Sequence, residues 1–264
     1  MRNRWFIALA AIGLHISIGS VYAWSVLTRP IMVDMGFTLS QTTWTFSLAI
    51  LMLGLSAGFL GSFAEKIGPK KSGLLAMLFW VTGLFGTAYA LSIHNLTLLY
   101  LFYGIIGGIG LGIGYITPVS TLVKYFPNRP GFATGLAIMG FGFASLIAGP
   151  LMQYLVAQVG LIDNFIILGV IYLVIMGASS LYLKAPQQKH PTRTTKDKST
   201  MYVHNHGMLA NDAMKTWQFG ALWWVFFINI TCGIGLLSLA SPMAQEAIGM
   251  TPAAAASLVG VIGI

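Results

Sequence analysis

The chain has 264 residues, of which 56% are hydrophobic and only 8% are charged. An average soluble domain carries roughly 25% charged residues, so this composition excludes a protein whose whole surface faces water and indicates lipid as the solvent. A net charge of +8 can indicate a nucleic-acid-binding protein. Here the basic residues lie between long apolar segments, and we expect no nucleic-acid partner.

Seven apolar segments are long enough to cross a bilayer as helices, which takes about 20 residues. In chain order they are 5–27, 42–63, 72–92, 96–121, 133–157, 164–183 and 217–239. An eighth apolar segment begins near Pro252 and continues to Ile264. Lipid offers no water to unpaired backbone groups, so we expect each segment to be helical.

The Lys and Arg residues predict the orientation of these helices. If the N-terminus lies inside the cell, the inner segments hold 13 of the 14 basic residues and the outer segments hold only Arg29. Cytoplasmic loops of membrane proteins carry such an excess of Lys and Arg. We therefore expect a multi-pass protein of the cell membrane, with the N-terminus and the longest connector in the cytosol.

The longest connector covers residues 185–216 and divides the predicted helices into six and two. This division predicts a six-helix N-terminal transmembrane lobe over 1–184, a cytoplasmic linker over 185–216, and about one and a half helices of a second lobe over 217–264. The last apolar segment stops after about half a bilayer, where unpaired carbonyl groups would be costly. We expect the rest of a second six-helix lobe beyond residue 264.

The connector also holds two histidines, His204 and His206, which could bind a metal ion. A pair of histidines that stands alone in a polar loop is more often solvated. We predict neither a metal site nor a cofactor.

The loop between the second and third predicted helices combines two glycines with an acid and several bases. Its residues are Gly61, Glu65, Lys66, Gly68, Lys70 and Lys71. We expect Gly61 to let the helices approach and Gly68 to permit a tight turn. This spacing resembles the signature loop of the major facilitator superfamily, although Glu65 replaces the usual aspartate and Pro69 a usual base. In that family the loop latches two lobes together while the cytoplasmic side is closed, so the resemblance implies a conformational switch. The alternative is a polar loop whose charges only follow the topology.

Further stretches carry a closer resemblance. They are 19–25 in the first helix, 103–118 and 124–135 in and after the fourth, 140–142 in the fifth, and 241–246, which we place after the seventh. This pattern resembles the oxalate:formate antiporter family, a bacterial branch that moves small carboxylates. It implies an all-α membrane protein with the major facilitator fold, working by alternating access. The arginine that many facilitators carry in the fourth helix is absent, and Tyr103 and Gly104 occupy that region.

In the antiporter family, aromatic residues of helices one, four and five line the carboxylate path. By position, the resemblance implies Tyr22, Tyr115 and Phe141, with Thr43 from helix two. At a rise of 1.5 Å per residue, Tyr22 should lie in the outer half of the membrane and the other two rings in the inner half. We therefore predict an outer constriction of Tyr22, Thr43 and Trp44 and an inner one of Tyr115 and Phe141. Ordinary packing of these aromatic residues is the alternative.

His15 is the one clearly ionisable side chain that we expect at mid-depth. It shares a helical face with Gly19 and Tyr22. Ionisable residues inside the membrane are functional candidates, and a histidine can help to couple protons. The alternative is a neutral histidine that forms a hydrogen bond with a neighbouring helix.

The glycines of the fourth helix form two stripes of small residues. The first stripe is Gly104, Gly108 and Gly112, and the second begins with Gly110 and Gly114. Such stripes let helix backbones touch in lipid, and we interpret them as packing surfaces.

These features together predict a secondary transporter of small carboxylates such as formate, oxalate, lactate or pyruvate. The sequence allows either symport with a proton or exchange for a counter-substrate anion. A monomer is compatible with the sequence. A carboxylate inside the membrane needs a counter-charge, yet no Lys or Arg lies at the centre of a predicted helix. The antiporter family supplies such cations from its second lobe.

Three other functions compete with this prediction. A facilitator for a different solute class, such as a drug, and a non-transporting sensor with the same fold both remain open. A membrane enzyme is not supported, because the chain holds neither a His-Glu-x-x-His nor a Gly-x-Ser-x-Gly sequence.

Overall fold

The computed structural model describes residues 3–186 and 210–263, and the secondary structure of these residues is entirely helical. They fall into two compact units, Met1–Pro186 with Leu237–Ile264, and Gln187–Leu236. The histidines of the connector, His204 and His206, lie outside the described residues. The division into lobes at residues 184 and 216 stays a prediction.

The helices follow the chain in the order that the apolar segments predict. They are α1 (Arg4–Gly19), the 3₁₀ turn η1 (Ser20–Ala23), α2 (Trp24–Met35), α3 (Leu39–Ile67), α4 (Pro69–Ser92), α5 (Leu96–Leu99), the π-helical η2 (Tyr100–Gly107), α6 (Gly108–Tyr125), α7 (Pro130–Val159), α8 (Leu161–Tyr182), α9 (Ala210–Ala213), α10 (Trp217–Ala247) and α11 (Pro252–Ile262). Two long spans are composite, since α1 to α2 and α5 to α6 each run without a break.

Seven spans of the described residues are long and apolar enough to cross a membrane, and they match the seven predicted segments. The structure extends most of them, and the first continues to Met35 instead of ending near residue 27. The placement of 241–246 after the seventh helix was wrong, because α10 continues through Pro242 to Ala247. A proline is tolerated inside a membrane helix when its surroundings satisfy the freed backbone groups.

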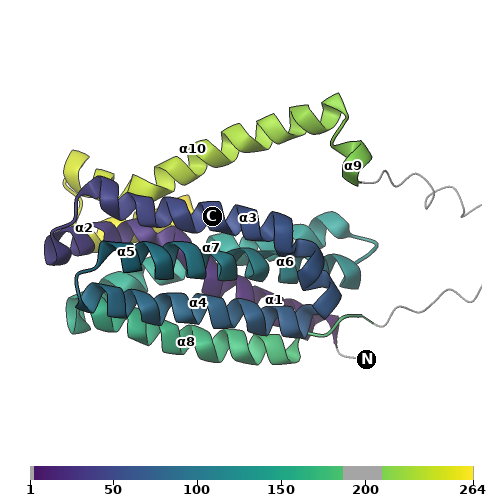
Figure 1. Ribbon diagram of the computed structural model, residues 1–264, viewed down its shortest axis with the longest axis horizontal. Helices are drawn as coiled ribbons and strands as arrows, with labels where there is room; N and C mark the ends of the chain where they lie inside the picture. Colours follow the sequence, from purple (N-terminus) through teal and green to yellow (C-terminus); the bar gives the residue numbers. More distant parts are fainter. Residues whose placement is uncertain (1–2, 187–209, 264) are drawn as a thin grey trace, which may run out of the picture. The chain divides into compact units, whose positions relative to one another are not determined.

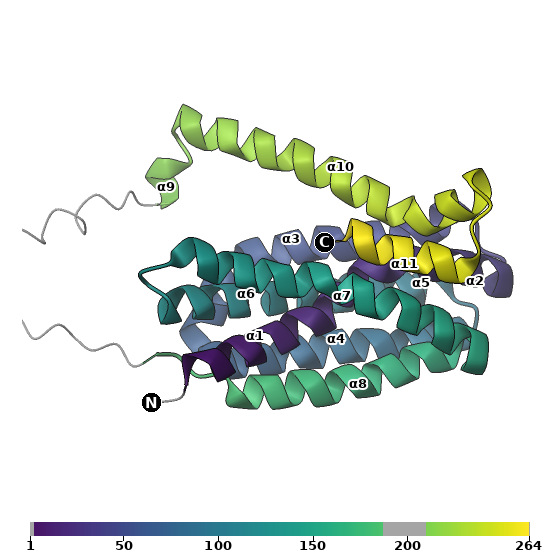
Figure 2. The same cartoon turned by 180° about the vertical axis from the view of Figure 1, so that it is seen from behind.

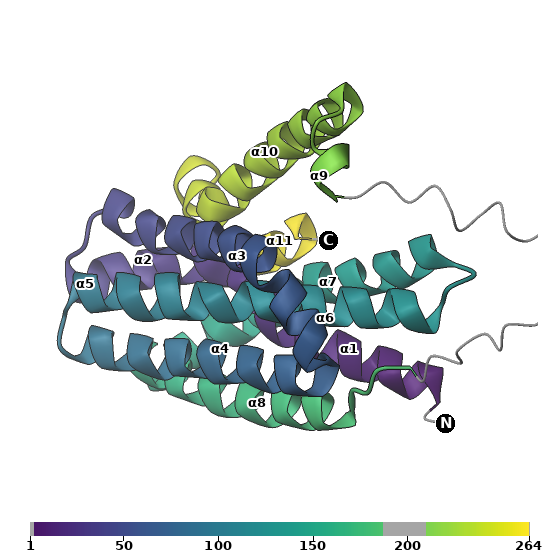
Figure 3. The same cartoon turned by 45° about the vertical axis from the view of Figure 1, so that its right-hand side comes forward.

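In the first unit, α1, α3, α4, α6, α7 and α8 lie side by side as a bundle (Figures 1 and 3). α4 packs against α8, and α3 packs against α6. α1 contacts α6, α7 and α8, and its span is the most deeply buried of the seven. The side chains of α1 are therefore placed to meet those of several other helices.

The N-terminal end of α1, the α3–α4 turn and the α6–α7 loop share one end of this bundle (Figure 1). We call it the basic end, because Arg4, Lys66, Lys124 and Arg129 belong to it. α11 packs along α7 within the same unit (Figure 2).

Local sequence explains the sharp turns of the bundle. Gly68 adopts a φ of 82° between α3 and α4, which confirms the predicted tight turn, and Pro69 opens α4. Gly160 adopts a φ of 89° between α7 and α8. At the other end of α3, Thr38 and Gln41 satisfy each other's backbone N–H groups as a capping box.

The two glycine stripes pack as the sequence predicts. A Cβ atom on Gly108 would lie 2.8 Å from the carbonyl oxygen of Ala49, so the first stripe touches the backbone of α3. A Cβ atom on Gly110 would lie 2.6 Å from the backbone nitrogen of Trp80, so the second stripe touches α4. Side chains at these positions would separate the helices.

The second unit is described from Ala210 to Leu236. Lys215 forms an ion pair with Asp212 at 3.9 Å between α9 and the start of α10. Along α10, the ring of Trp223 stacks on that of Phe227 with centroids 5.0 Å apart.

Candidate functional site

Four of the predicted site residues meet in one place, which we call the aromatic cluster: His15, Tyr22, Tyr115 and Phe141. The ring of Phe141 lies at its centre, with centroids 4.8 Å from Tyr22, 5.4 Å from Tyr115 and 5.9 Å from His15. All three contacts are edge-to-face, a favourable arrangement for aromatic rings. The ring of His15 also stacks on Tyr115, at 5.5 Å and 26°. The cluster therefore joins α1, η1, α6 and α7.

Two glycines allow this meeting. A Cβ atom on Gly19 would press against the carbonyl oxygen of Phe141 and lie 2.8 Å from the Cβ of Ala144. A Cβ atom on Gly140 would lie 3.4 Å from the Cβ of His15. α1 and α7 thus cross with almost no side chain between them, and the predicted face of His15, Gly19 and Tyr22 is confirmed because all three face Phe141.

The predicted separation of Tyr22 from Phe141 was wrong. Tyr22 lies 18 residues beyond Arg4, or about 27 Å, and Phe141 lies 11 residues beyond Pro130, or about 17 Å. Counting along straight helices therefore leaves a gap of about 10 Å in depth. Two long aromatic side chains on crossing helices close this gap, so one cluster replaces the two constrictions.

Thr43 and Trp44 do not join Tyr22 in the described residues. The hydroxyl of Thr43 donates a hydrogen bond to the carbonyl oxygen of Leu39 in its own helix, at 2.8 Å. The side chain of Trp44 is 58% exposed. The grouping of these two residues with Tyr22 is not formed, and their contact with a substrate stays a prediction.

The two tyrosines of the cluster offer free hydrogen-bond donors. Both side chains are half-buried, and both rings contact Phe141. Among the described residues, neither hydroxyl has a hydrogen-bond partner. A phenol donates one hydrogen bond and accepts others, so the pair of Tyr22 and Tyr115 can bind a polar ligand above the apolar ring of Phe141.

His15 is fully buried and reaches the backbones of two other helices. Its Nδ1 lies 2.5 Å from the carbonyl oxygen of Ala137 in α7, and its Nε2 lies 3.0 Å from that of Tyr115 in α6. The predicted hydrogen bond from His15 to a neighbouring helix is thus present, with one contact to α7 and another to α6. The side chain holds α1 to both of its partners at the level of the aromatic cluster.

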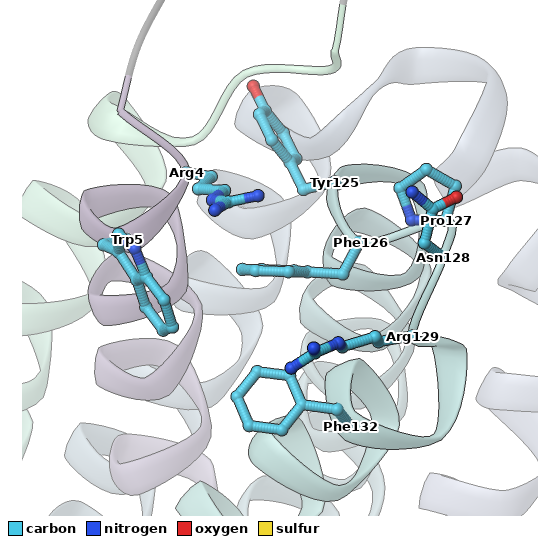
Figure 4. Close-up of a pocket in the computed structure, with 8 residues that line it drawn as sticks. All are labelled: Arg4, Trp5, Tyr125, Phe126, Pro127, Asn128, Arg129 and Phe132. Atoms are coloured by element: carbon cyan, nitrogen blue, oxygen red, sulfur yellow. The ribbon is translucent and has the colours of Figure 1, made fainter.

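A cavity of about 330 Å³ lies at the basic end, and we call it the basic pocket. Its lining residues are Arg4, Trp5, Tyr125, Phe126, Pro127, Asn128, Arg129 and Phe132. Figure 4 shows the ring of Phe126 between the two arginine side chains. The guanidinium carbon of Arg4 lies 5.6 Å from the centroid of this ring, within the range of a cation–π contact.

The basic pocket carries positive charge without a partner of opposite sign. In the described part of the chain, neither Arg4 nor Arg129 forms an ion pair with a carboxylate. α7 begins beside Arg129 at Pro130 and has no side-chain cap, so the positive end of its dipole adds to the field. In the sequence, these arginines indicate the topology and, for Arg129, the family resemblance, but not a pocket. Arg4 is followed by Trp5, and Arg129 is close to Phe132 in the sequence. Only the fold brings the start of α1 and the α6–α7 loop together in one pocket.

The signature loop forms an ion pair within the first unit. Glu65 on α3 pairs with Lys124 on α6 at 3.0 Å, and the two side chains are 48% and 49% exposed. Lys66, Lys70 and Lys71 form no ion pair with any described residue. A Cβ atom on Gly61 would lie 3.0 Å from the side chain of Ile116, so this glycine does bring α3 close to α6. The latch between lobes stays a prediction.

The sequence profile of the Major Facilitator Superfamily matches residues 6–264. The chain belongs to the major facilitator superfamily. This membership confirms the predicted fold class and identifies a multi-pass membrane protein. It fits a bundle whose helices approach through glycine stripes and whose α3–α4 turn carries the signature loop.

Similar curated proteins include transporters of carboxylates. The chain is 30% identical to an uncharacterised transporter of the same superfamily from Escherichia coli, over 100% of this chain and 63% of that protein. It is 26% identical to the oxalate:formate antiporter of Oxalobacter formigenes, over 90% of this chain and 54% of that protein, which confirms the resemblance to that family. It is 27% identical to human monocarboxylate transporter 14, over 71% of this chain and 36% of that protein. The chain thus spans less than two thirds of the length of each of these relatives.

Among solved structures, the crystal structure of a D-xylose–proton symporter superposes with a TM-score of 0.67. The match covers 98% of this chain and 65% of that protein at 14% sequence identity. This likeness shows the fold alone.

Replacing Phe141 by alanine removes the ring on which the other three members of the cluster meet. We expect the free energy of unfolding in detergent to fall by up to about 3 kcal/mol, because packing contacts are lost without compensation. Phe143→Ala is the matched control, since that ring lies two residues along the same helix and is 37% exposed. Thermal unfolding measures both variants, and equal losses would contradict a special role for the Phe141 contacts.

Proposed function

We propose that the full-length protein is a secondary transporter that moves small carboxylates across the cell membrane by alternating access. Formate, oxalate, lactate and pyruvate are the proposed substrates. The observation that carries this proposal is the pair of half-buried tyrosines, Tyr22 and Tyr115, whose hydroxyls have no described protein partner and whose rings both pack edge-to-face with Phe141.

The depth of the cluster supports a substrate site. Tyr115 lies 10 residues from the end of α6 and Phe141 lies 11 residues from the start of α7, which places both about 15–17 Å from the basic end. This is about half of a hydrocarbon core roughly 30 Å thick. Transporters built from repeats bind their substrates near the bilayer midplane.

The chemistry of the cluster suits a small anion. Phenol hydroxyls donate hydrogen bonds to carboxylate oxygens, and bonds to a charged group are stronger than neutral ones. Phe141 and the surrounding aliphatic residues offer an apolar surface to a short carbon chain. The few polar groups of the site are better matched to a small acid than to a sugar, which needs many hydrogen-bonding partners.

The basic pocket supports the same class of substrate. If the basic end faces the cytosol, as the distribution of Lys and Arg predicts, Arg4 and Arg129 offer unpaired cations in a pocket to an anion that approaches from that side. Their field raises the local concentration of anions. We infer that the pocket gathers carboxylates before they reach the aromatic cluster.

The relatives favour carboxylates over other solutes. Two of them are named as an oxalate:formate antiporter and a monocarboxylate transporter, whereas the sugar symporter shares only the fold. We infer also that the signature loop around Glu65 acts as a switch between conformations. No cofactor or catalytic step is needed for such a function, and lipid and the substrate are the proposed partners.

Uptake by the full-length protein tests this proposal, and two variants of Tyr115 test the site. In proteoliposomes we expect uptake of at least one of radiolabelled formate, oxalate, lactate and pyruvate, above that of empty liposomes. Tyr115→Phe keeps the ring and removes the hydroxyl, so KM should rise at least about tenfold, since a hydrogen bond to a charged group contributes about 1.5–3 kcal/mol. Tyr115→Ala should impair transport of every substrate.

Three outcomes would contradict the proposal. Uptake of none of the four acids, together with uptake of xylose or of a cationic drug, would establish a different solute class. Failure to move any solute would favour a sensor. Wild-type kinetics in both variants would show that Tyr115 contributes only to packing.

The basic pocket is tested by removing one of its charges. We expect Arg129→Gln to raise KM about threefold for substrate offered to the cytosolic face, with little change in kcat, because the arginine acts by long-range attraction. Inside-out vesicles give access to this face. Lys184→Gln is the control, since it removes one exposed charge at the same end but does not line the pocket. The difference should vanish at 1 M KCl, where screening is strong, and its persistence would exclude attraction at a distance.

The switch loop is tested by breaking its ion pair from either side. Glu65→Gln should slow turnover more than it weakens substrate binding, with almost no change in thermal stability, because exposed ion pairs contribute only about 0–1 kcal/mol. Lys124→Gln removes the partner seen within the unit. If Glu65 also contacts a second lobe, turnover falls further in Glu65→Gln than in Lys124→Gln. Equal turnover in both variants would limit Glu65 to the pair with Lys124.

A further inference from the structure

Both ring nitrogens of His15 face carbonyl oxygens, and this determines which form of the ring fits the site. Nδ1 faces Ala137 and Nε2 faces Tyr115. A carbonyl oxygen only accepts hydrogen bonds, so each nitrogen must donate one. A neutral imidazole has one N–H group and one bare nitrogen, whereas the imidazolium has two N–H groups. The neutral ring would set a lone pair against a carbonyl oxygen at one of these two contacts.

We propose that His15 is a proton-binding site and that its imidazolium supplies the positive charge against which an anionic substrate is carried. The proton site follows from the geometry of the ring and its two carbonyl partners. The role toward the anion rests on the proposed function.

The surroundings of the ring reduce the cost of burying its charge. A buried cation is expensive unless hydrogen bonds satisfy it, and here two charge-assisted bonds do so. The face of the Tyr115 ring lies 5.5 Å away and nearly parallel, a distance at which a π system attracts a cation. Gly140 leaves room for the side chain to approach α7 so closely.

No competing charge faces His15 within the described residues. α6 presents Tyr115 and α7 presents Phe141, with η1 adding Tyr22 behind that ring. From α8, the side chain of Ser179 faces Gly13, one half-turn before His15. In this part of the chain the ring forms no bond with a carboxylate, lysine or arginine. Among the described residues, no carboxylate balances the charge of the imidazolium, and a bound anion would do so.

His15 lies beside the candidate substrate site. It is 11 residues beyond Arg4, or about 17 Å from the basic end, level with Tyr115 and Phe141. A carboxylate bound to the hydroxyl of Tyr115 would lie at the edge of the ring on which the imidazolium stacks. The missing counter-charge of the predicted helices is thus present, but only when His15 holds its proton.

The same contacts link the proton to movement. Both nitrogens are covered in this conformation, so the ring can exchange its proton with water only after α1 separates from α6 or α7. Loss of the proton removes one of the two bonds that hold α1 to those helices. One proton is taken from water on the side to which the site is open and returned to water on the other side. Anion and proton would therefore cross in the same direction.

Nitrogen-15 NMR tests the proton site without any substrate. The changes His94→Asn, His190→Gln, His204→Gln and His206→Gln, with glutamine at any histidine in the rest of the full-length protein, leave His15 as the only histidine. Asparagine suits position 94 because His94 has a φ of 52°. In lipid bilayers at about pH 6–7, near the ordinary titration range of histidine, we expect both nitrogens of His15 to give protonated resonances. A bare-nitrogen resonance from His15 throughout about pH 5–8 would overturn the proposal.

Transport driven by a pH gradient tests the coupling. The wild-type protein should accumulate the labelled acid that it moves fastest, among formate, oxalate, lactate and pyruvate, when the liposome interior is alkaline. In His15→Gln we expect this response to fall at least about tenfold, as for loss of a charge-assisted contact. His94→Asn, which changes an exposed histidine, should behave as the wild type.

The two experiments separate the proposals. If no carboxylate is transported but His15 is doubly protonated, the proposed function fails and the proton site stands. If carboxylates are transported and the pH response is unchanged in His15→Gln, the coupling role fails. If His15→Gln does not fold, the NMR result on the single-histidine protein still decides the proton site.

Discussion

Direct contact between the backbones of α1 and α7 is the constraint on which the candidate site depends. Gly19 and Gly140 leave no side chain between these helices, and in lipid such contact is a main source of helix association. Only this approach lets the ring of His15 reach a carbonyl oxygen of α7 while it also reaches one of α6. The same approach presses Tyr22 onto Phe141.

The distribution of charge gives the first unit a consistent electrostatic character. Unpaired arginines gather at the basic end, whereas the described mid-depth site contains tyrosine hydroxyls and one histidine in place of fixed charges. A permanent cation at mid-depth would hold an anion tightly and slow its release. A cation that exists only while a proton is bound avoids this difficulty, because the charge can be removed when the substrate leaves.

The fold by itself does not select the substrate. A sugar–proton symporter shares this architecture at 14% identity, and one architecture commonly supports many functions. What differs is the chemistry of a few side chains at the contact of α1, α6 and α7. A cluster with two phenols, a phenyl ring and a histidine is small and has few hydrogen-bonding groups, which is why the proposed cargo is a short acid.

The sequence by itself determined the seven spans, their order, the tight turn at Gly68 and the packing role of the glycine stripes. These follow from local properties, since an apolar segment of sufficient length must be a helix in lipid and small residues, glycine above all, let backbones touch. It also identified His15, Tyr22, Tyr115 and Phe141 one by one. The tertiary structure decided that they form a single cluster and that Arg4 and Arg129 share a pocket. Such meetings depend on helix crossings and tilts between residues about a hundred positions apart, which no local pattern specifies.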